Sequence, residues 1–286
     1  MLKFPKVLHL EPTTKCNAEC PQCQRTYSTF TPAELSLDDI KRLFSVEFIQ
    51  QLEKMFMCGN LGDPAAAKET LEIFEYFRKI NPNIILGLNT NGGLRSTSWW
   101  KSLADILNKE YDYVVFSIDG LQDTNHIYRK NVNWNKLMQN ASSFINAGGS
   151  AHWDMLVFEH NEHQVEQVKQ LATTMKFRWF RAKVSKRHKD IPIKGINPPT
   201  NWNSPNVLSG EISCHALNEQ SIYVDAQGKF YPCCWIGAAG LEIKDFSIIS
   251  NTWGTDNQHP ICTSVCTANT SGTSFLNQWQ QEISLC

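Results

Sequence analysis

The chain lacks an excess of charge of either sign. Its 286 residues include 27 Lys and Arg against 28 Asp and Glu, which gives a formal net charge of −1. Nucleic-acid binders usually carry a basic excess, so this composition argues against a nucleic-acid partner. One basic run, residues 183–189, could contact an acidic substrate, but we interpret it as a solvated strand end or loop.

Long apolar runs are also missing. No stretch approaches the ~18 to 20 apolar residues that would span a bilayer, and the N-terminus lacks the apolar core of a signal peptide. We therefore expect a cytoplasmic protein with no membrane contact. Internal repeats and low-complexity tracts are absent as well. The ten cysteines, gathered towards both ends of the chain, then indicate metal or catalytic roles rather than disulfides.

The first two thirds of the chain alternate between short β-rich runs and helical patterns, which predicts an α/β fold with a parallel sheet. The runs are mostly continuous and apolar, so we expect strands without a polar face in a sheet that is covered on both sides. The six expected strands are 7–11, 55–59, 84–89, 113–118, 152–158 and 178–184.

Cap residues predict where several helices begin. Ser36 and Asp39 form a capping-box pattern, and Asp63 followed by Pro64 is typical of an N-cap and a first-turn proline. A further helix is expected after Asn161, because apolar residues recur there at helical spacing.

The alternation stops after Lys189. Residues 191–213 are rich in Pro, Asn and Ser and predict a connecting segment. A β-hairpin is expected from 221–225 and 229–232, and a closing helix around Phe275, Trp279 and Ile283. We therefore divide the chain into residues 1–190 and 191–286.

Three cysteines lie within eight residues directly after the first expected strand: Cys16, Cys20 and Cys23. In barrel-like α/β folds, the loops at this end of the strands meet at a shared active-site mouth. Three thiolates on one loop can hold an iron–sulfur cube and leave its fourth iron open. The spacing Cys-x3-Cys-x2-Cys resembles that of the radical SAM superfamily.

The resemblance implies an enzyme. In that family the open iron of a [4Fe–4S] cluster chelates S-adenosylmethionine through its amino and carboxylate groups. Reductive cleavage then gives a 5′-deoxyadenosyl radical, which abstracts hydrogen from a substrate. The resemblance also implies an external electron donor such as a flavodoxin or ferredoxin, and a partial (β/α)6 TIM-like barrel across residues 1–190.

The first cysteine cluster departs from the family at one position. An aromatic residue that packs on the adenine often precedes the third cysteine, whereas this chain has Gln22, which we expect to make a polar contact with the cofactor. A zinc knuckle is the alternative use of these cysteines. It would need a fourth nearby ligand, and none follows soon after Cys23.

The segment from Cys58 to Pro64 resembles a variant of the Gly-Gly-Glu-Pro-like turn of the family. Glycine lets a backbone approach a ligand closely, and carbonyls with an acidic side chain can receive the ammonium group of the cofactor. The candidates are Gly59, Asn60 and Asp63, although Asp63 could also cap the following helix. We interpret Cys58 as a buried structural thiol.

Polar residues followed by glycine end the third and fourth strands. In the resembled family such groups help to bind the ribose or methionine of the cofactor, or the substrate. The cofactor-binding candidates at these two strand ends are Asn89, Asn91, Ser117 and Asp119. A simple turn is the alternative and is favoured for Asn91. Tyr128 and Arg129 resemble the Tyr-Arg pair of many relatives and could contact substrate or a surface carboxylate.

Cys214 and Cys233 enclose Gly228 in the pattern Cys-x9-15-Gly-x4-Cys, which resembles the start of the SPASM and Twitch extensions of radical SAM enzymes. This resemblance implies an auxiliary [4Fe–4S] cluster. Two such clusters would need about eight thiolates, and only six cysteines lie beyond residue 200, so a single-cluster Twitch subdomain fits better. Its predicted ligands are Cys214, Cys233, Cys262 and Cys266.

Alternatives remain for this second group of cysteines. Cys233 and Cys234 could exchange roles, and the same four positions could build a structural zinc site. Cys286 is expected to be free. Four filled positions would leave no open iron, so such a centre would transfer electrons or shape the pocket.

The reaction class follows less directly. A filled auxiliary cluster suits the oxidation of a small sugar-like or alcohol substrate, which is the leading prediction. Modification of a peptide is the second enzyme class. Epimerisation would need a hydrogen donor such as a spare cysteine. A non-catalytic iron–sulfur or zinc protein, acting as an electron carrier or scaffold, is the remaining alternative.

Overall fold

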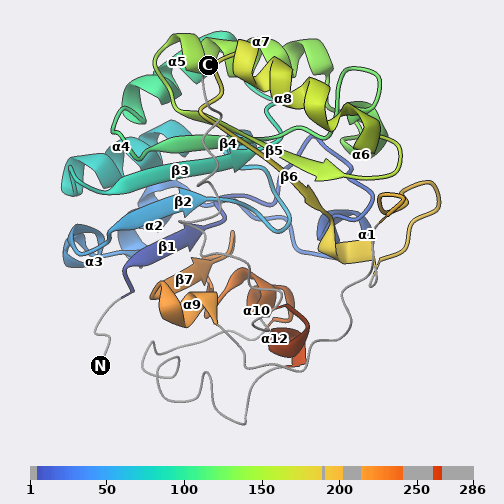
Figure 1. Ribbon diagram of the computed structural model, residues 1–286. Helices are drawn as coiled ribbons and strands as arrows, with labels where there is room; N and C mark the ends of the chain where they lie inside the picture. The colour runs from blue at the N-terminus through green and yellow to red at the C-terminus, as the bar shows by residue number, and fades with distance from the viewer. Residues whose placement is uncertain (1–4, 189–190, 202–213, 241–259, 266–286) are drawn as a thin grey trace.

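The sheet at the centre of the protein confirms the predicted α/β class. In the computed structural model, which describes residues 5–188, 191–201, 214–240 and 260–265, six parallel strands follow the order β6-β5-β4-β3-β2-β1 (Figure 1). All six lie within two residues of the predicted bounds. They are β1 (Val7–Leu10), β2 (Lys54–Met57), β3 (Ile85–Thr90), β4 (Tyr113–Ser117), β5 (Ala151–Val157) and β6 (Trp179–Val184).

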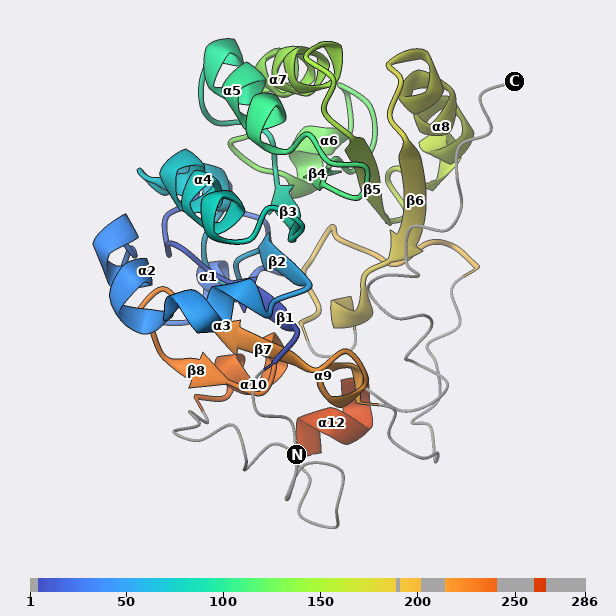
Figure 2. The same ribbon diagram turned by 90° about the vertical axis from the view of Figure 1, so that its left-hand side faces the viewer.

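Helices between the strands cover the outer face of the sheet. Figure 2 shows the six strands along an arc with these helices outside it, as expected for a partial barrel. The α-helices in residues 5–188 are α1 (Gln24–Tyr27), α2 (Leu37–Leu43), α3 (Val46–Gln50), α4 (Thr70–Ile80), α5 (Thr97–Ile106), α6 (Asn125–Tyr128), α7 (Trp134–Asn146) and α8 (Val165–Thr174). Short 3-10 helices are η1 (Pro64–Ala66), η2 (Glu162–Gln164) and η3 (Lys186–His188). None of the helices in the described ranges combines the length and apolar character needed to cross a membrane.

Local capping confirms the predicted helix starts. Ser36 and Asp39 form the full capping box of α2, with the Asp39 N–H donating to Ser36 Oγ at 3.1 Å. The Asp63 side chain caps η1, in which Pro64 is the first residue. The helix expected after Asn161 begins as η2 and continues as α8.

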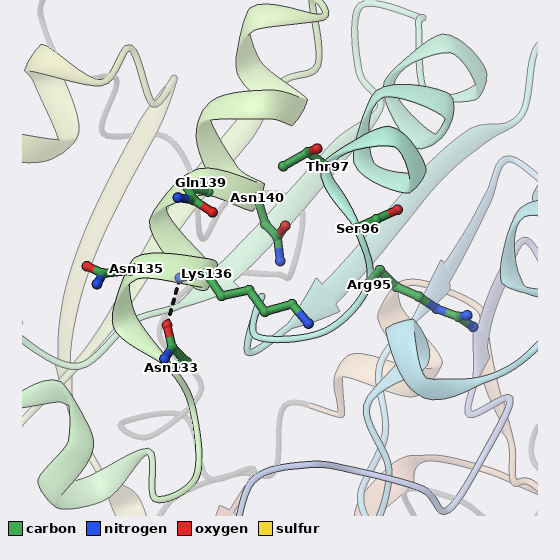
Figure 3. A pocket seen from close by; sticks show the side chains of 8 residues that line it. All are labelled: Arg95, Ser96, Thr97, Asn133, Asn135, Lys136, Gln139 and Asn140. Carbon is green, nitrogen blue, oxygen red and sulfur yellow. Dashed lines mark hydrogen bonds between the residues drawn. The ribbon is translucent and has the colours of Figure 1, made fainter.

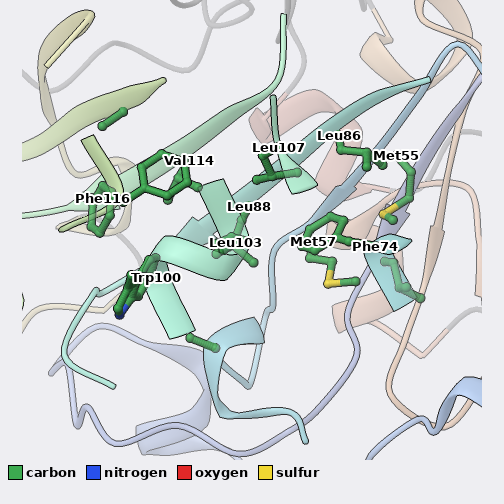
Figure 4. Close-up of a cluster of buried hydrophobic side chains, with 14 of the residues drawn as sticks. Met55, Met57, Phe74, Leu86, Leu88, Trp100, Leu103, Leu107, Val114 and Phe116 are labelled. Carbon is green, nitrogen blue, oxygen red and sulfur yellow. The ribbon is translucent and has the colours of Figure 1, made fainter. Parts of the chain in front are cut away.

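The main core lies between the sheet and the helices. Alternate strand residues point to it because successive side chains of a strand face opposite sides. Figure 4 shows strand residues such as Leu88 and Phe116 packed against Trp100 and Leu103 of α5, all fully buried. Full burial of such a side chain contributes roughly 1.5 to 3 kcal/mol, so this layer fixes the strands that carry the site.

The inner face of the sheet differs from the expectation that the strands have no polar face. It carries His9, whose ring stacks on Phe56 at a centroid distance of 4.4 Å, and Tyr113, whose ring stacks on His152 at 5.3 Å. The Lys54 ammonium lies 4.8 Å from the centre of the Tyr113 ring. Each of these polar side chains lies among the apolar residues of its own strand, so a reading of the strand as a continuous apolar run conceals it.

The predicted hairpin is present as β7 (Ser221–Val224) and β8 (Phe230–Tyr231), with Gly228 at φ +78° in its turn. Beyond the prediction, β7 pairs in parallel with β1, so both strands extend the sheet and the described part contains eight strands. The other described elements of this region are α9 (His215–Asn218), α10 (Cys234–Ala238) and α12 (Pro260–Val265). The helix expected around Phe275, Trp279 and Ile283 lies outside the described residues.

Phe74 in α4 tests the core. Phe74→Ala should lower the free energy of unfolding by about 3 to 5 kcal/mol, because it removes a fully buried ring and leaves a cavity. The exposed Tyr111 provides the control, since Tyr111→Ala should change the stability by no more than about 0.5 kcal/mol. Urea unfolding of both variants measures the difference, and equal effects would contradict the assignment of the core.

Candidate functional site

The loop after β1 carries the three predicted cluster ligands. Cys20 is buried, whereas Cys16 and Cys23 are half-buried, and all three are free thiols. The Cys23 N–H donates to the Cys20 carbonyl at 3.0 Å, so a tight turn joins two of the cysteines. Cys20 and Cys23 also lie near enough to Cys16 to raise its pKa, so the three thiols are neighbours on the loop after β1.

Hydrogen bonds surround the three sulfur atoms. The Ala18 N–H and the Asn91 side-chain amide donate to Cys16 Sγ at 3.3 and 3.7 Å, and the Arg129 guanidinium donates to Cys20 Sγ at 3.7 Å. The Cys23 thiol lies 3.8 Å from the Asn60 carbonyl oxygen. Two predicted site residues, Asn60 and Asn91, thus contact the predicted ligands directly.

The chemistry of this donor set fits an iron–sulfur cluster. Burial raises the pKa of Cys16 to about 12 and also raises that of Cys20, so these two thiols hold their protons. Bound iron would supply the positive charge that makes the thiolates favourable, and N–H donors stabilise such sulfurs. Within the described residues, no three Cys, His, Asp or Glu side chains are grouped to hold a single metal ion.

The turn after β2 depends on two glycines. A Cβ atom on Gly59 would lie 2.2 Å from the Gly62 carbonyl oxygen, and one on Gly62 would lie 1.8 Å from the Thr13 carbonyl oxygen. The turn therefore packs against the chain that leads into the cysteine loop, and its close approach to a cofactor stays a prediction.

Glu11, which the sequence analysis did not single out, holds this turn from the end of β1. One carboxylate oxygen accepts the N–H groups of Leu61 at 2.7 Å and Gly62 at 2.9 Å. The other accepts the hydroxyl of Tyr223 in β7. Burial raises the pKa of Glu11. Its only signal in the sequence is an acidic residue at the end of an apolar strand.

Asp63 joins the turn to the end of β3. Its buried carboxylate accepts the N–H groups of Ala65 at 2.9 Å and Asn91 at 2.7 Å, and the Thr90 hydroxyl at 2.9 Å. The first of these bonds is the predicted helix cap. The structure thus gives Asp63 a positioning role, and its contact with a cofactor stays a prediction.

The strand-end candidates fall into two groups. Asn91 reaches Cys16 and also accepts the Gly93 N–H at 2.9 Å, so it acts in the turn as well. Asp119 is fully buried and pairs with Arg129 at 2.6 Å. Asn89 and Ser117 lie on the inner face at the ends of β3 and β4, and Asn89 Oδ1 is buried without a partner in the described part of the chain.

Gln22 lies away from these groups. Its fully buried side chain accepts the Ser185 hydroxyl at 2.8 Å and donates to the Ile191 carbonyl at 3.1 Å. The amide nitrogen also lies 3.4 Å from His188 Nδ1. The side chain therefore ties the cysteine loop to the segment after β6, and the predicted contact with the cofactor has no support in this geometry.

The second group of cysteines is described in part. Cys214 and Cys233 are half-buried, Cys262 is buried, and Cys266 lies outside the described residues. Burial raises the pKa of Cys233, and the neighbouring thiols of Cys234 and Cys214 raise it further. Burial and the nearby Cys58 raise the pKa of Cys234 to about 12. The two adjacent cysteines thus have different neighbours.

A charged group on the inner face was also not predicted as a site. Asp154 in β5 accepts two hydrogen bonds from Arg181 in β6, both at 2.8 Å, and one from Lys183 at 2.7 Å. Lys183 begins the basic run that was interpreted as a solvated strand end. The ion pair gives this residue a partner within the sheet.

A pocket of about 490 Å³ lies outside the barrel, between the N-terminal ends of α5 and α7 (Figure 3). None of its lining residues is a predicted site residue. Its polar groups serve the fold: Ser96 and Asn133 cap the two helices, and Arg95 Nε donates to the Ala65 carbonyl at 2.7 Å. We therefore place the candidate site at the cysteine loop.

Comparison with known proteins gives a match over the part of the chain that includes this loop. The Radical SAM superfamily model matches residues 10–172, more than half of the chain. A protein of Pyrococcus furiosus, the tungsten-containing aldehyde ferredoxin oxidoreductase cofactor-modifying protein, is 28% identical over 123 residues. This match covers 43% of the present chain and only 33% of that protein, so the chain spans about a third of its relative.

Two solved structures share the fold. SuiB from Streptococcus suis, bound to S-adenosylmethionine, has a TM-score of 0.63 and 16% identity over 96% of this chain and 72% of its own. Native anSMEcpe with bound AdoMet and Kp18Cys peptide has a TM-score of 0.59 and 16% identity over 92% and 81%. At this identity the likeness concerns the fold.

The bonds of Asp63 lead to a test of the site. Thr90→Val keeps the side-chain shape but removes the hydroxyl that donates to Asp63, so it should lower the stability by about 1 to 3 kcal/mol. Thr97→Val, at an exposed position at the start of α5, should change it by no more than about 0.5 kcal/mol. Urea unfolding compares the two, and a silent Thr90→Val would contradict the anchoring of the turn.

Proposed function

Because the chain belongs to the radical SAM superfamily, we propose that Cys16, Cys20 and Cys23 hold a [4Fe–4S] cluster whose open iron takes S-adenosylmethionine. The observation that supports this most is the set of hydrogen bonds around the three thiols on one loop at the end of β1. When bound, the cluster supplies the electron that cleaves the cofactor and so begins hydrogen abstraction from a substrate.

The chain itself would position the cofactor through the turn after β2. Gly59 and Gly62 leave no room for a side chain, and Glu11 holds the N–H groups of the turn. The turn carbonyls are therefore the groups proposed to receive the ammonium of S-adenosylmethionine, since the Asn60 carbonyl already lies beside Cys23. The Asn60 side chain instead donates to the Cys234 carbonyl at 2.8 Å.

The inner face of the barrel would receive the remaining groups. Asn89 and Ser117 are assigned to the cofactor or substrate, because they end neighbouring strands on this face and Asn89 Oδ1 is a buried acceptor whose hydrogen bond is unmade in the described residues. Asp119 and Asp63 are assigned to positioning, since Asp119 accepts bonds from β5 and from Arg129 after α6, and Asp63 accepts bonds from η1 and from the end of β3.

The second group of cysteines is proposed to hold an auxiliary [4Fe–4S] cluster in a Twitch-type subdomain across residues 191–286. Its ligands would be Cys214, Cys233, Cys262 and Cys266. The neighbourhood of Cys233 and Cys214 supports Cys233 over Cys234, whose neighbour is Cys58. A structural zinc site on the same positions is the alternative.

For the reaction, we propose oxidation of a small sugar-like or alcohol substrate, which a filled auxiliary cluster would suit by accepting an electron. Modification of a peptide is the second candidate, and the structural similarity to anSMEcpe with a bound peptide favours keeping it. The flavodoxin or ferredoxin donor and the cytoplasmic location stay predictions from the sequence.

Iron counting after anaerobic reconstitution tests the two clusters together. The intact chain should bind about eight irons and the triple variant Cys16→Ala, Cys20→Ala, Cys23→Ala about four. After reduction with S-adenosylmethionine present, the intact chain should release 5′-deoxyadenosine and the triple variant should release none. The double variant Cys214→Ala, Cys233→Ala should also bind about four irons but should still release the product.

Cys234→Ala is the matched control for these variants, and its iron content should equal that of the intact chain. A fully loaded and reduced protein that releases no 5′-deoxyadenosine, with candidate substrates present, would overturn the proposed function. A zinc content of one per chain in place of four irons would overturn the auxiliary cluster alone.

Asp63 separates an enzyme from a simple electron carrier. Ala65 and Asn91 donate to different oxygens of Asp63, so Asp63→Asn places an amide donor against one of these N–H groups; the turn should shift and the Kd for S-adenosylmethionine should rise by roughly tenfold, which is 1.4 kcal/mol. The exposed Asp38→Asn should leave the Kd unchanged. Calorimetric titration of the reconstituted proteins measures both. A simple electron carrier would not bind S-adenosylmethionine, so neither the intact chain nor the two variants would give a binding signal.

A further inference from the structure

Arg129 and Asp119 form a buried ion pair beside the cysteine loop. The Arg129 Nε atom donates to Asp119 Oδ2 at 2.6 Å, and the exposed fractions of the two side chains are 16% and 0%. A guanidinium in this setting is always protonated. The pair therefore places a fixed positive charge in a region that water reaches poorly.

Several elements hold Asp119 in place. The N–H of Leu156 in β5 donates to Asp119 Oδ1 at 2.6 Å, and the Asp119 N–H donates to Asn125 Oδ1 of α6 at 2.8 Å. The Asn161 side chain donates to the Asp119 carbonyl oxygen at 3.0 Å. Asp119 thus fixes the direction of the guanidinium, because its own position leaves little freedom.

The other end of the guanidinium reaches a proposed cluster ligand. Arg129 Nη1 donates to Cys20 Sγ at 3.7 Å, and Cys20 is only 7% exposed. The donors to Cys16 are a backbone N–H and the Asn91 amide, both neutral, and Cys23 lies against a carbonyl oxygen. In the described part of the chain, Arg129 is the charged donor to these three sulfurs.

We propose that Arg129 raises the reduction potential of the cluster on Cys16, Cys20 and Cys23 by stabilising its reduced form, and that Asp119 sets the size of this effect. The inference rests on the proposed function. Reduction adds one negative charge to a buried centre, so a nearby cation favours the reduced form. A hydrogen bond to a ligand sulfur acts in the same direction, whereas the Asp119 carboxylate offsets part of the charge.

The two residues should therefore shift the potential in opposite directions. Arg129→Gln removes the cation and should lower the equilibrium constant for one-electron reduction of the cluster by at least tenfold. This corresponds to a midpoint potential lower by about 59 mV. Asp119→Asn leaves the cation without its offset and should raise the potential. Arg129→Lys keeps the charge but loses the rigid fork, so its shift should be smaller than that of Arg129→Gln.

A second buried pair provides the matched control. Arg78 and Asp112 are also joined by an ion pair, with exposed fractions of 15% and 0%, and Asp112 accepts the Leu86 N–H at the start of β3. This is the end of the sheet away from the cysteine loop. Arg78→Gln also breaks a buried ion pair, but far from the cluster, so it should leave the reduction potential of the cluster unchanged. The comparison therefore separates a local electrostatic effect from a general loss of stability.

The experiment is a redox titration of the anaerobically reconstituted full chain, monitored by electron paramagnetic resonance. The signal followed is the one that changes when S-adenosylmethionine is added, because this identifies the cluster with the open iron. The expected result is a lower midpoint in Arg129→Gln, a higher one in Asp119→Asn and no shift in Arg78→Gln. If Arg129→Gln binds no cluster, the other two variants test the inference. The midpoint potential should then be lower in Arg129→Lys and higher in Asp119→Asn than in the intact chain.

Two results would overturn the inference. Midpoints equal to that of the intact chain in the Arg129 and Asp119 variants, with normal iron content and a normal response to the cofactor, would show that the pair has a structural role only and would leave the proposed function standing. An intact chain with full iron content and no signal that responds to S-adenosylmethionine would overturn the proposed function and this inference with it.

Discussion

The burial of one carboxylate, that of Glu11, governs how the site is assembled. It lies at the end of β1 and accepts hydrogen bonds from the turn after β2 and from Tyr223 of β7. A buried carboxylate without such donors would cost several kcal/mol, so the three elements are held in one arrangement. Because the cysteine loop leaves β1 directly after this residue, its position relative to the turn follows from the same contacts.

Polar side chains that are hydrogen-bonded to other parts of the protein surround the site. Asp63, Asp119 and Asp154 are each engaged by donors from a neighbouring strand or turn. Such networks rigidify a site when every member is satisfied. Asn89 Oδ1, near the end of β3, is a buried acceptor without a partner in the described part of the chain, so a proposed ligand at this end of the sheet could complete its bonding.

The sequence predicted the strands well because each is a short apolar run between turn residues. It also predicted the cysteine loop, whose spacing is a local property. It did not predict Glu11, Arg181 or the pairing of β7 with β1, because these depend on contacts between residues far apart in the chain. Gln22 illustrates the limit: its position beside Cys23 suggested a contact with the cofactor, but its partners come from residues 185–191.

The pairing of β1 with β7 has a consequence for synthesis. It joins Val7 to Ser221, more than 200 positions apart, while β2 through β6 are made in between. At roughly 5 to 20 residues per second, the ribosome takes about 10 to 40 seconds to reach β7 after it has made β1. Throughout that interval the edge of β1 that later pairs with β7 presents unpaired N–H and C=O groups. Glu11 also lacks the hydrogen bond from the Tyr223 hydroxyl, because Tyr223 has not yet been made. The strand that leads into the cysteine loop is made first, but it gains its second neighbour only after β2 to β6 have been made.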